Sequence, residues 1–231
     1  MKYIYNHLGL GDHVICNGLY RELCNPQDNY TLFVKHHNVT TVSFMLRDLK
    51  NISIKPVNSD DEVINFLSTS QVDKKSLIVI GFCQIPLPGA KDFDDTFYLQ
   101  HGVSFDKRWS SFKCDRDMES EKRLFDKFNV KENEYVFIHD DQSREYEIDE
   151  SYVVNKDLPI IRPIPGLTDN SFDYCYLMQN SKESHFIDSS FRLIFDSLQL
   201  RDTNLFYHLS LKNGKVKDYF KSHSKLNFKI I

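Results

Sequence analysis

The sequence predicts an α/β fold made of two small Rossmann-like domains that face a cleft. Strand-like and helix-like segments alternate at short intervals along both halves of the chain, which is the pattern of βαβ units around a mostly parallel sheet. Segment 76–82, SLIVIGF, is an almost continuous apolar run, as expected of a strand buried on both faces. Because a charged stretch, 115–130, separates the two series, we place the domains at residues 1–120 and 121–231.

Composition limits the class of protein. The chain has 231 residues, 41% of them hydrophobic, and a net charge of -4, which suits one large or two small globular domains. The acidic balance gives no overall electrostatic footprint for nucleic acid. The last 20 residues lean basic, which we interpret as a solvated surface, with docking to an anionic membrane or substrate as the alternative. These lysines are Lys212, Lys215, Lys217, Lys221, Lys225 and Lys229.

Cysteine usage and the N-terminus bear on location. The cysteines are dispersed and lack CxxC spacing, which favours thiols in a reducing compartment over disulfides or a zinc site. They are Cys16, Cys24, Cys83, Cys114 and Cys175. No basic region followed by an apolar core begins the chain, and no apolar run approaches the ~20 residues that span a bilayer. We therefore expect a cytoplasmic protein with at most peripheral membrane association.

The first half reads as alternating strands and helices. Segment 1–7 is β-prone, and after two glycines apolar residues recur at helical spacing until Asn25-Pro26. Strands are expected at 30–37, 52–57 and 76–82. Helices are expected at 39–49 and at 60–70, where acidic residues open the segment and suit a helix N-terminus. Segment 83–115 is irregular and contains the single tryptophan.

The second half repeats this logic without a detectable sequence repeat. Segment 115–130 reads as a charged helix that links the halves. Strands are expected at 134–141, 158–165, 183–190, 203–211 and 226–231. Helices are expected at 171–182, 191–200 and 215–223, of which 191–200 is amphipathic.

The first loop, HLGLGDH, supplies the first candidate site residue. Loops at the carboxyl ends of parallel strands hold ligands, and Gly9 and Gly11 allow a ligand to approach the backbone. The dinucleotide pattern GxGxxG is not met, because residue 14 is valine, and no GxxxxGK[ST] loop is present. Asp12 is therefore either a first-turn or capping acid of the following helix or a base presented at the mouth of a cleft.

Turn 188–190 after the strand at 183–187 supplies the second candidate. Asp188, Ser189 or Ser190 can cap the next helix. Their hydroxyls and the unpaired backbone N–H groups can also hold an anion such as a diphosphate. His185 lies just before this turn, where a structural role inside the strand is the simpler interpretation.

Segment 137–145, FIHDDQSRE, follows the first strand of the same half. Arg144 can form bidentate bonds to phosphate oxygens, or it can pair with Asp140 or Asp141. His139 can contact a substrate or serve the structure alone. Arg162, at the end of the next expected strand, is a further candidate for a nucleotide.

The opening segment LGLGDHVICNGLYREL resembles that of bacterial glycosyltransferases with the GT-B fold, especially the ADP-heptose heptosyltransferases. The chain also resembles short bacterial and viral GT-B proteins in segments 97–109, 137–145 and 185–198. The matched motifs cover about a quarter of the chain. The chain differs from the heptosyltransferases in two respects. It is shorter, and the Asp-Thr-Gly donor turn of that family is replaced here by Asp188-Ser189-Ser190.

The resemblance implies a glycosyltransferase that moves a sugar from a nucleotide-diphosphate sugar to a hydroxyl group of a glycan acceptor. Asp12 matches the family's general base. Gly11, His139, Arg144, Arg162, Ser189 and Ser190 would then bind the donor, with Arg144 neutralising the leaving diphosphate. We expect the anomeric configuration to be inverted, and no cofactor beyond the donor itself.

Residues of the first half are candidates for binding the acceptor. Lys35 ends the second expected strand, and His101, Arg108 and Trp109 lie in the irregular middle segment. Indole rings stack on sugar faces, and basic groups bind hydroxyls or phosphates, although Trp109 can equally belong to the core.

No required metal is expected. Asp115-x-Asp117 has the spacing of metal-dependent transferases of the other main fold, but it lies in a charged, helix-like stretch and reads as surface. Two other functions stay open: a non-catalytic carbohydrate- or nucleotide-binding protein, and another enzyme on this fold, a sugar-nucleotide epimerase or a pyruvyl-type transferase.

Overall fold

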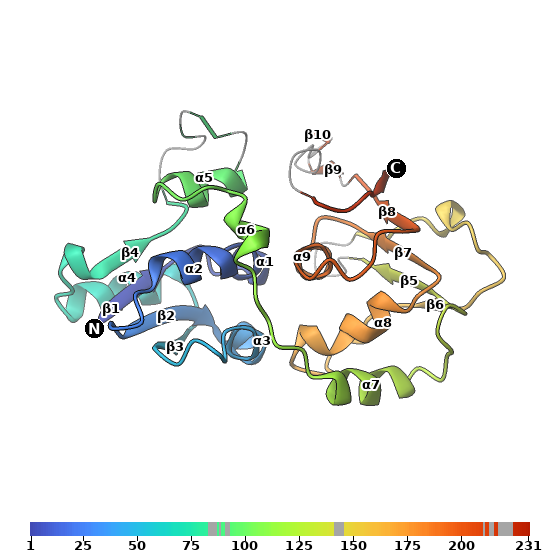
Figure 1. Cartoon of the computed structure of the whole chain (residues 1–231), viewed down its shortest axis with the longest axis horizontal. Helices are drawn as coiled ribbons and strands as arrows, with labels where there is room; N and C mark the ends of the chain where they lie inside the picture. Colours follow the sequence, from blue (N-terminus) through green and yellow to red (C-terminus); the bar gives the residue numbers. More distant parts are fainter. Residues whose placement is uncertain are drawn as a thin grey trace. The chain divides into compact units, whose positions relative to one another are not determined.

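The structure is a computed structural model of the whole chain, shown in Figure 1. It describes residues 1–82, 87, 89–90, 93–140, 146–209, 211–212, 215–216 and 224–231, of which 211–212 and 215–216 are described by their backbone alone. The chain divides into two compact units, Met1–Asp115 and Arg116–Ile231. Each unit is α/β and is built on a parallel sheet.

The first unit contains a four-stranded sheet in the order β3-β2-β1-β4. Its strands are β1 (Lys2–Tyr5), β2 (Tyr30–Lys35), β3 (Ile52–Val57) and β4 (Leu77–Val79), all parallel. Its helices are α1 (Leu10–Ile15), α2 (Asn17–Leu23), α3 (Val39–Met45), α4 (Asp60–Thr69), α5 (Phe93–Leu99) and α6 (Lys107–Ser110), with short 3₁₀ turns at η1 (His36–Asn38) and η2 (Lys74–Ser76).

One hydrophobic cluster of this unit forms where β1, β2 and β3 meet α4. Tyr5, Phe33 and Val63 are buried there and pack with Leu8 and Val57. The rings of Tyr5 and Phe33 meet edge to face, with centroids 6.4 Å apart. Burying such aromatic and branched side chains against each other stabilises the unit.

The second unit contains a five-stranded sheet in the order β11-β8-β7-β5-β6. Its strands are β5 (Val136–His139), β6 (Ile160–Ile161), β7 (Glu183–Phe186), β8 (Leu205–Tyr207) and β11 (Lys229–Ile230), again parallel. A separate antiparallel pair joins β9 (Leu211–Lys212) and β10 (Lys215–Val216). The helices are α7 (Met118–Asp126), α8 (Cys175–Gln179) and α9 (Ser190–Ser197), with 3₁₀ turns at η4 (Glu150–Tyr152) and η5 (Ser171–Tyr174).

The predicted linking helix belongs to the second unit. α7 packs against α8 and η5, and Figure 1 shows α7 beside α8. Arg116 precedes it and bonds both Glu121 and Gln179. The boundary between the compact units therefore lies before α7, at residues 115 and 116, five residues ahead of the predicted one.

Several predicted elements differ from the structure. The first helix breaks at Cys16 into α1 and α2, and the irregular middle segment contains α5 and α6. The helix expected at 39–49 ends at Met45, and His36 and His37, expected to end a strand, begin η1 instead. Of the helix expected at 215–223, residues 215–216 form strand β10, which pairs with β9, and residues 217–223 lie outside the described residues.

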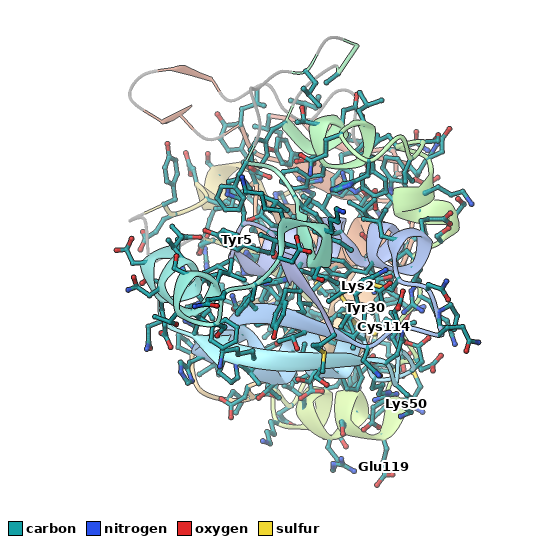
Figure 2. All side chains as sticks on the ribbon, turned by 90° about the vertical axis from the view of Figure 1, so that its left-hand side faces the viewer. Lys2, Tyr5, Tyr30, Lys50, Cys114 and Glu119 are labelled. Carbon is teal, nitrogen blue, oxygen red and sulfur yellow. The ribbon has the colours of Figure 1, made fainter. Side chains whose placement is uncertain are left out.

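The amino ends of the first sheet are closed by an ion pair. Lys2 contacts Asp28 at 2.7 Å, and its ammonium lies 5.8 Å from the centroid of the Tyr30 ring. Figure 2 shows Lys2 beside Tyr30, away from Tyr5 at the other end of β1. The loops with the predicted site residues begin at the opposite edge, which the carboxyl ends of the strands form.

Among the described residues, no helix has the length and apolarity that crossing a membrane requires.

Candidate functional site

Each parallel sheet has a point at which the strand order reverses, and the predicted residues follow the strands at these points. In the first unit β2 and β3 lie on one side of β1 and β4 on the other. In the second unit β6 lies beyond β5, whereas β7 and β8 continue in the opposite direction. Ligands of open α/β sheets bind beyond the carboxyl ends of strands at such switch points. Asp12 follows β1, His139 ends β5, and Ser189 follows β7.

Asp12 lies in the first turn of α1 and is half-buried. The cap of this helix is Gly9, so Asp12 is a first-turn acid and not the N-cap. A Cβ atom on Gly9 would lie only 2.5 Å from Oδ2 of Asp12. Glycine at position 9 is therefore a steric requirement of the carboxylate position. Gly11, the second glycine, is also half-buried and lies within α1.

A buried polar network that sequence reasoning missed includes His13, the residue that follows Asp12 in α1. The amide of Asn6 donates to the hydroxyl oxygen of Tyr20 at 2.7 Å, and that hydroxyl can donate to Nδ1 of His13 at 3.0 Å. All three side chains are fully buried. Burial lowers the pKa of His13 to about 3, so the ring is neutral at physiological pH. A histidine at position 4 of a short helix gave no sequence signal, because burial on all sides cannot be read from spacing.

Two of the residues predicted to bind an acceptor occupy the carboxyl edge of the first sheet. Lys35 ends β2 and is half-buried. His101 follows α5, and its Nε2 lies 3.2 Å from the carbonyl oxygen of Val79, the last residue of β4. Burial lowers the pKa of His101, and the Val79 carbonyl offsets part of that effect.

Arg108 and Trp109 are adjacent on α6 but differ in exposure. Arg108 has no exposed surface, pairs with Asp94 at 3.1 Å, and lies 5.0 Å from the centroid of the Trp109 ring. Trp109 is half-buried and packs edge to face on Phe105. Arg108 therefore packs against the indole ring inside the unit. Its side chain has no exposed surface that could contact an acceptor, contrary to the prediction.

In the second unit, Ser189, one of the three residues named as possible caps, caps α9. Its hydroxyl accepts a hydrogen bond from the N–H of Arg192 at 3.4 Å, and Ser190 begins the helix. The first turn of an α-helix leaves N–H groups without intrahelical partners and carries a partial positive charge. Asp188 pairs with Arg192 across the same turn at 2.9 Å. Burial opposes the charge on Arg192, but Asp188 and Asp196 raise its pKa above the usual value.

The neighbouring strands bring His139 and Arg162 to this edge. His139 is aligned with Phe186 in the parallel register, and its ring stacks on that of Phe191, with centroids 4.1 Å apart.

Arg162 follows β6 and pairs with Asp140 at 2.6 Å and Glu150 at 2.8 Å. Burial opposes the charge on Arg162, but these two carboxylates raise its pKa above the usual value. Arg144 and Asp141 lie outside the described residues.

A second buried network that sequence reasoning missed runs through β7 and β8. Glu183 contacts Nε2 of His185 at 2.6 Å, and Nδ1 of His185 lies 2.8 Å from Nε2 of His208. His185 is inside the strand, as predicted, and fully buried. Alternation along β7 places Glu183 and His185 on one face, but the partner on β8 follows only from strand order.

Chemically, these edges can bind an anion at the α9 turn and accept a proton at Asp12. In the described part of the chain, no group of three or more His, Cys, Asp or Glu side chains is arranged to hold a metal ion. Cys16, Cys24, Cys114 and Cys175 are thiols, and Cys83 is outside the described residues.

Comparison of the chain with protein-family models, with curated proteins and with solved structures finds no match.

Proposed function

We propose that the chain is a GT-B-type glycosyltransferase that transfers a sugar from a nucleotide-diphosphate sugar to a hydroxyl acceptor. The observation that carries the proposal is the position of Asp12 and of the Ser189–Ser190 turn. Each follows an interior strand at the point where its sheet reverses order, which is where open α/β sheets bind ligands. The proposal also rests on the resemblance of the opening segment to the GT-B family.

In the proposed reaction the hydroxyl oxygen of the acceptor attacks the anomeric carbon, while the bond from that carbon to the diphosphate oxygen breaks. The carboxylate of Asp12 takes the hydroxyl proton, and the bonding electrons leave with the diphosphate. A single displacement of this kind inverts the anomeric configuration. The first-turn N–H groups of α9 and the hydroxyls of Ser189 and Ser190 would stabilise the charge that develops on the diphosphate.

Carboxylates already occupy Arg162, which makes this residue a poor site for a phosphate. This guanidinium is engaged by two carboxylates, so a phosphate would have to displace at least one of them. The helix turn at Ser189 is thus the stronger candidate for the diphosphate. Arg192, which sequence reasoning did not identify, is buried beside this turn, and Asp188 balances its positive charge.

The experiment that tests the proposal measures nucleoside diphosphate release from nucleotide sugars in the presence of hydroxyl acceptors. Asp12→Asn removes the proton acceptor and nearly preserves shape, so we expect kcat to fall by about 10²- to 10⁴-fold. Asp28→Asn makes the same chemical change at the amino edge of the same sheet and should leave kcat unchanged.

Equal loss of activity in both variants, or full activity in Asp12→Asn, would contradict the role of Asp12. Nucleotide binding without any turnover of a donor would support the non-catalytic binding protein instead.

A further inference from the structure

The hydrogen bonds that link Glu183, His185 and His208 determine which nitrogen of each imidazole carries a proton. Burial works to raise the pKa of Glu183, but donors from Val154, His185 and Asn155 outweigh it and hold that pKa below its usual value. Glu183 is therefore an ionised carboxylate, which only accepts hydrogen bonds. Its contact at 2.6 Å requires a proton on Nε2 of His185.

The same reasoning extends one ring further. A neutral imidazole that is protonated on Nε2 is unprotonated on Nδ1. Nδ1 of His185 must then accept at 2.8 Å from Nε2–H of His208. Burial lowers the pKa of His185, and burial together with the neighbouring His185 lowers the pKa of His208 to about 4, although Asp140 and Asp149 oppose this. Both rings are neutral at physiological pH, so Nδ1 of His208 carries a lone pair.

Nδ1 of His208 makes no hydrogen bond to any part of the chain that the structure describes. His208 directly follows β8, and its neighbour Tyr207 is aligned with Phe186 at the carboxyl edge. The side chain is 8% exposed, and the ring of Tyr152, itself 50% exposed, meets it edge to face with centroids 5.6 Å apart. A fixed acceptor and an open aromatic ring thus adjoin each other at the edge where ligands bind.

The surroundings select the chemistry of the ligand. A lone pair together with the nearby carboxylates Asp140 and Asp149 repels an anion and attracts hydrogen-bond donors. Neutral hydroxyl groups on a ring that can cover Tyr152 meet both conditions. We propose that His208 binds ligand, with Nδ1 accepting a hydrogen bond from a hydroxyl group of a sugar or of a ribose that packs on Tyr152.

This inference deepens the proposed function and rests on it, because both substrates of a glycosyltransferase carry such hydroxyls. The first measurement needs no substrate. In the full-length protein with ¹⁵N-labelled histidine, long-range ¹H–¹⁵N spectra identify the tautomer of each ring, and His208→Gln assigns the resonance. We expect His208 to be protonated on Nε2 alone from pH 6 to pH 8. A proton on Nδ1 of His208 in this range overturns the inference.

The second measurement adds methyl glycosides, free nucleosides, and the diphosphates UDP, GDP, ADP and dTDP to the same protein. At least one probe should move the Nδ1 resonance of His208. His208→Phe, which deletes the acceptor, should weaken that probe's binding by about 2- to 13-fold, the equivalent of one neutral hydrogen bond. His208→Gln keeps a donor for His185 and an acceptor for ligand and should recover part of the affinity.

The outcomes distinguish a sugar hydroxyl from a ribose hydroxyl, and they distinguish failure of this inference from failure of the proposed transferase function. A response to methyl glycosides alone assigns the site to a sugar, and a response to nucleosides assigns it to ribose. A sugar or nucleoside that moves His208 while no diphosphate binds supports the inference and counts against the transferase. A diphosphate that binds without moving His208, and equally well in His208→Phe, overturns the inference and leaves the transferase standing. Failure of every probe to bind counts against both.

Discussion

His13 shows what a single buried side chain contributes. Its ring is enclosed, and Nδ1 is engaged by Tyr20, while Nε2 has no partner among the described residues. Since neutral imidazole carries a proton on only one nitrogen, acceptance at Nδ1 leaves a buried N–H donor at Nε2. Among the described residues, the oxygen Oδ1 of Asn6 is likewise buried without a hydrogen-bond partner.

The pKa of His13 predicts a specific loss of stability in acid. The folded-state pKa, about 3, lies below the unfolded value of about 6.5, so the unfolded chain binds the proton more tightly. Stability is therefore complete above pH 6.5 and falls as the pH drops from 6.5 toward 3. We expect the free energy of unfolding in urea to fall by about 2–3 kcal/mol between pH 6.5 and pH 4.5 from this group.

The control for this prediction is His13→Gln, which cannot titrate and should have a flatter pH profile over the same window. The pair of Asp48 with Arg21 does not confuse the measurement, because hydrogen bonds from Arg21 lower the pKa of Asp48 to about 2. Its contribution is lost only as the pH falls below about 4. Identical profiles for His13→Gln and wild type would contradict the assignment.

Gly9 gives a test of Asp12 that leaves the carboxylate in place. A methyl group at Gly9 collides with the end of the Asp12 side chain, which must rotate away. Misplacement of a catalytic group by about 1 Å can cost 10²-fold in rate. We expect Gly9→Ala to lower kcat for sugar transfer by roughly 10- to 100-fold, less than Asp12→Asn, while the melting temperature changes little. Gly9→Ala with wild-type kcat would show that the exact carboxylate position is irrelevant.

At the scale of elements, the close approach of α2 to α6 depends on Gly18. A Cβ atom at this position would lie 2.1 Å from the carbonyl oxygen of Lys107, a backbone atom that cannot move alone. Alanine would favour the helix by about 1 kcal/mol, but overpacking costs about 1–3 kcal/mol. We expect a net loss for Gly18→Ala in denaturant unfolding.

Thr40→Ala, on the exposed side of α3, also raises helix propensity, by less than Gly→Ala does, without a collision, and should raise stability by no more than about 0.5 kcal/mol. A stability gain in Gly18→Ala as large as that of Thr40→Ala would contradict the close packing of α2 on α6.

The cap of α9 links stability to ligand binding. Ser189→Ala removes the side-chain acceptor of the Arg192 N–H and should cost about 1 kcal/mol of unfolding free energy. Because the same hydroxyl would contact the diphosphate, we expect weaker binding of nucleoside diphosphates as well. Ser197→Ala, at the other end of α9, is the control for binding. Loss of stability with unchanged diphosphate affinity would assign Ser189 to capping alone.

The elements show how far sequence patterns reach. The buried strands and the capped α9 were predictable, because apolar runs and a Ser turn before an amphipathic segment are local signals. The helices α5 and α6 were not, since prolines and aromatics around them hide helical spacing. The buried network of Glu183, His185 and His208 joins two strands through histidines that are 23 positions apart in the sequence, and no local pattern specifies that these strands are neighbours. His208 could be identified only once the order of the sheet was known.

For the whole molecule, the described features are two α/β units with parallel sheets, each carrying polar groups at the carboxyl edge of its interior strands. The sequence predicted this division from the alternation of strand and helix, and it predicted a cleft between the domains. That cleft stays a prediction. The proposed reaction needs the carboxylate of Asp12 and the turn at Ser189 to act on one pair of substrates, so binding of the donor is its first requirement.

The most direct test is a thermal-shift screen of the full-length protein against UDP-, GDP-, ADP- and dTDP-sugars. A ligand at 100 times its dissociation constant stabilises the folded state by about 2.7 kcal/mol, which corresponds to a rise of about 5–10 °C in melting temperature for a chain of this size. We expect at least one nucleotide sugar to produce such a rise and Ser189→Ala to reduce it. No rise with any of the four classes at millimolar concentration would contradict the transferase.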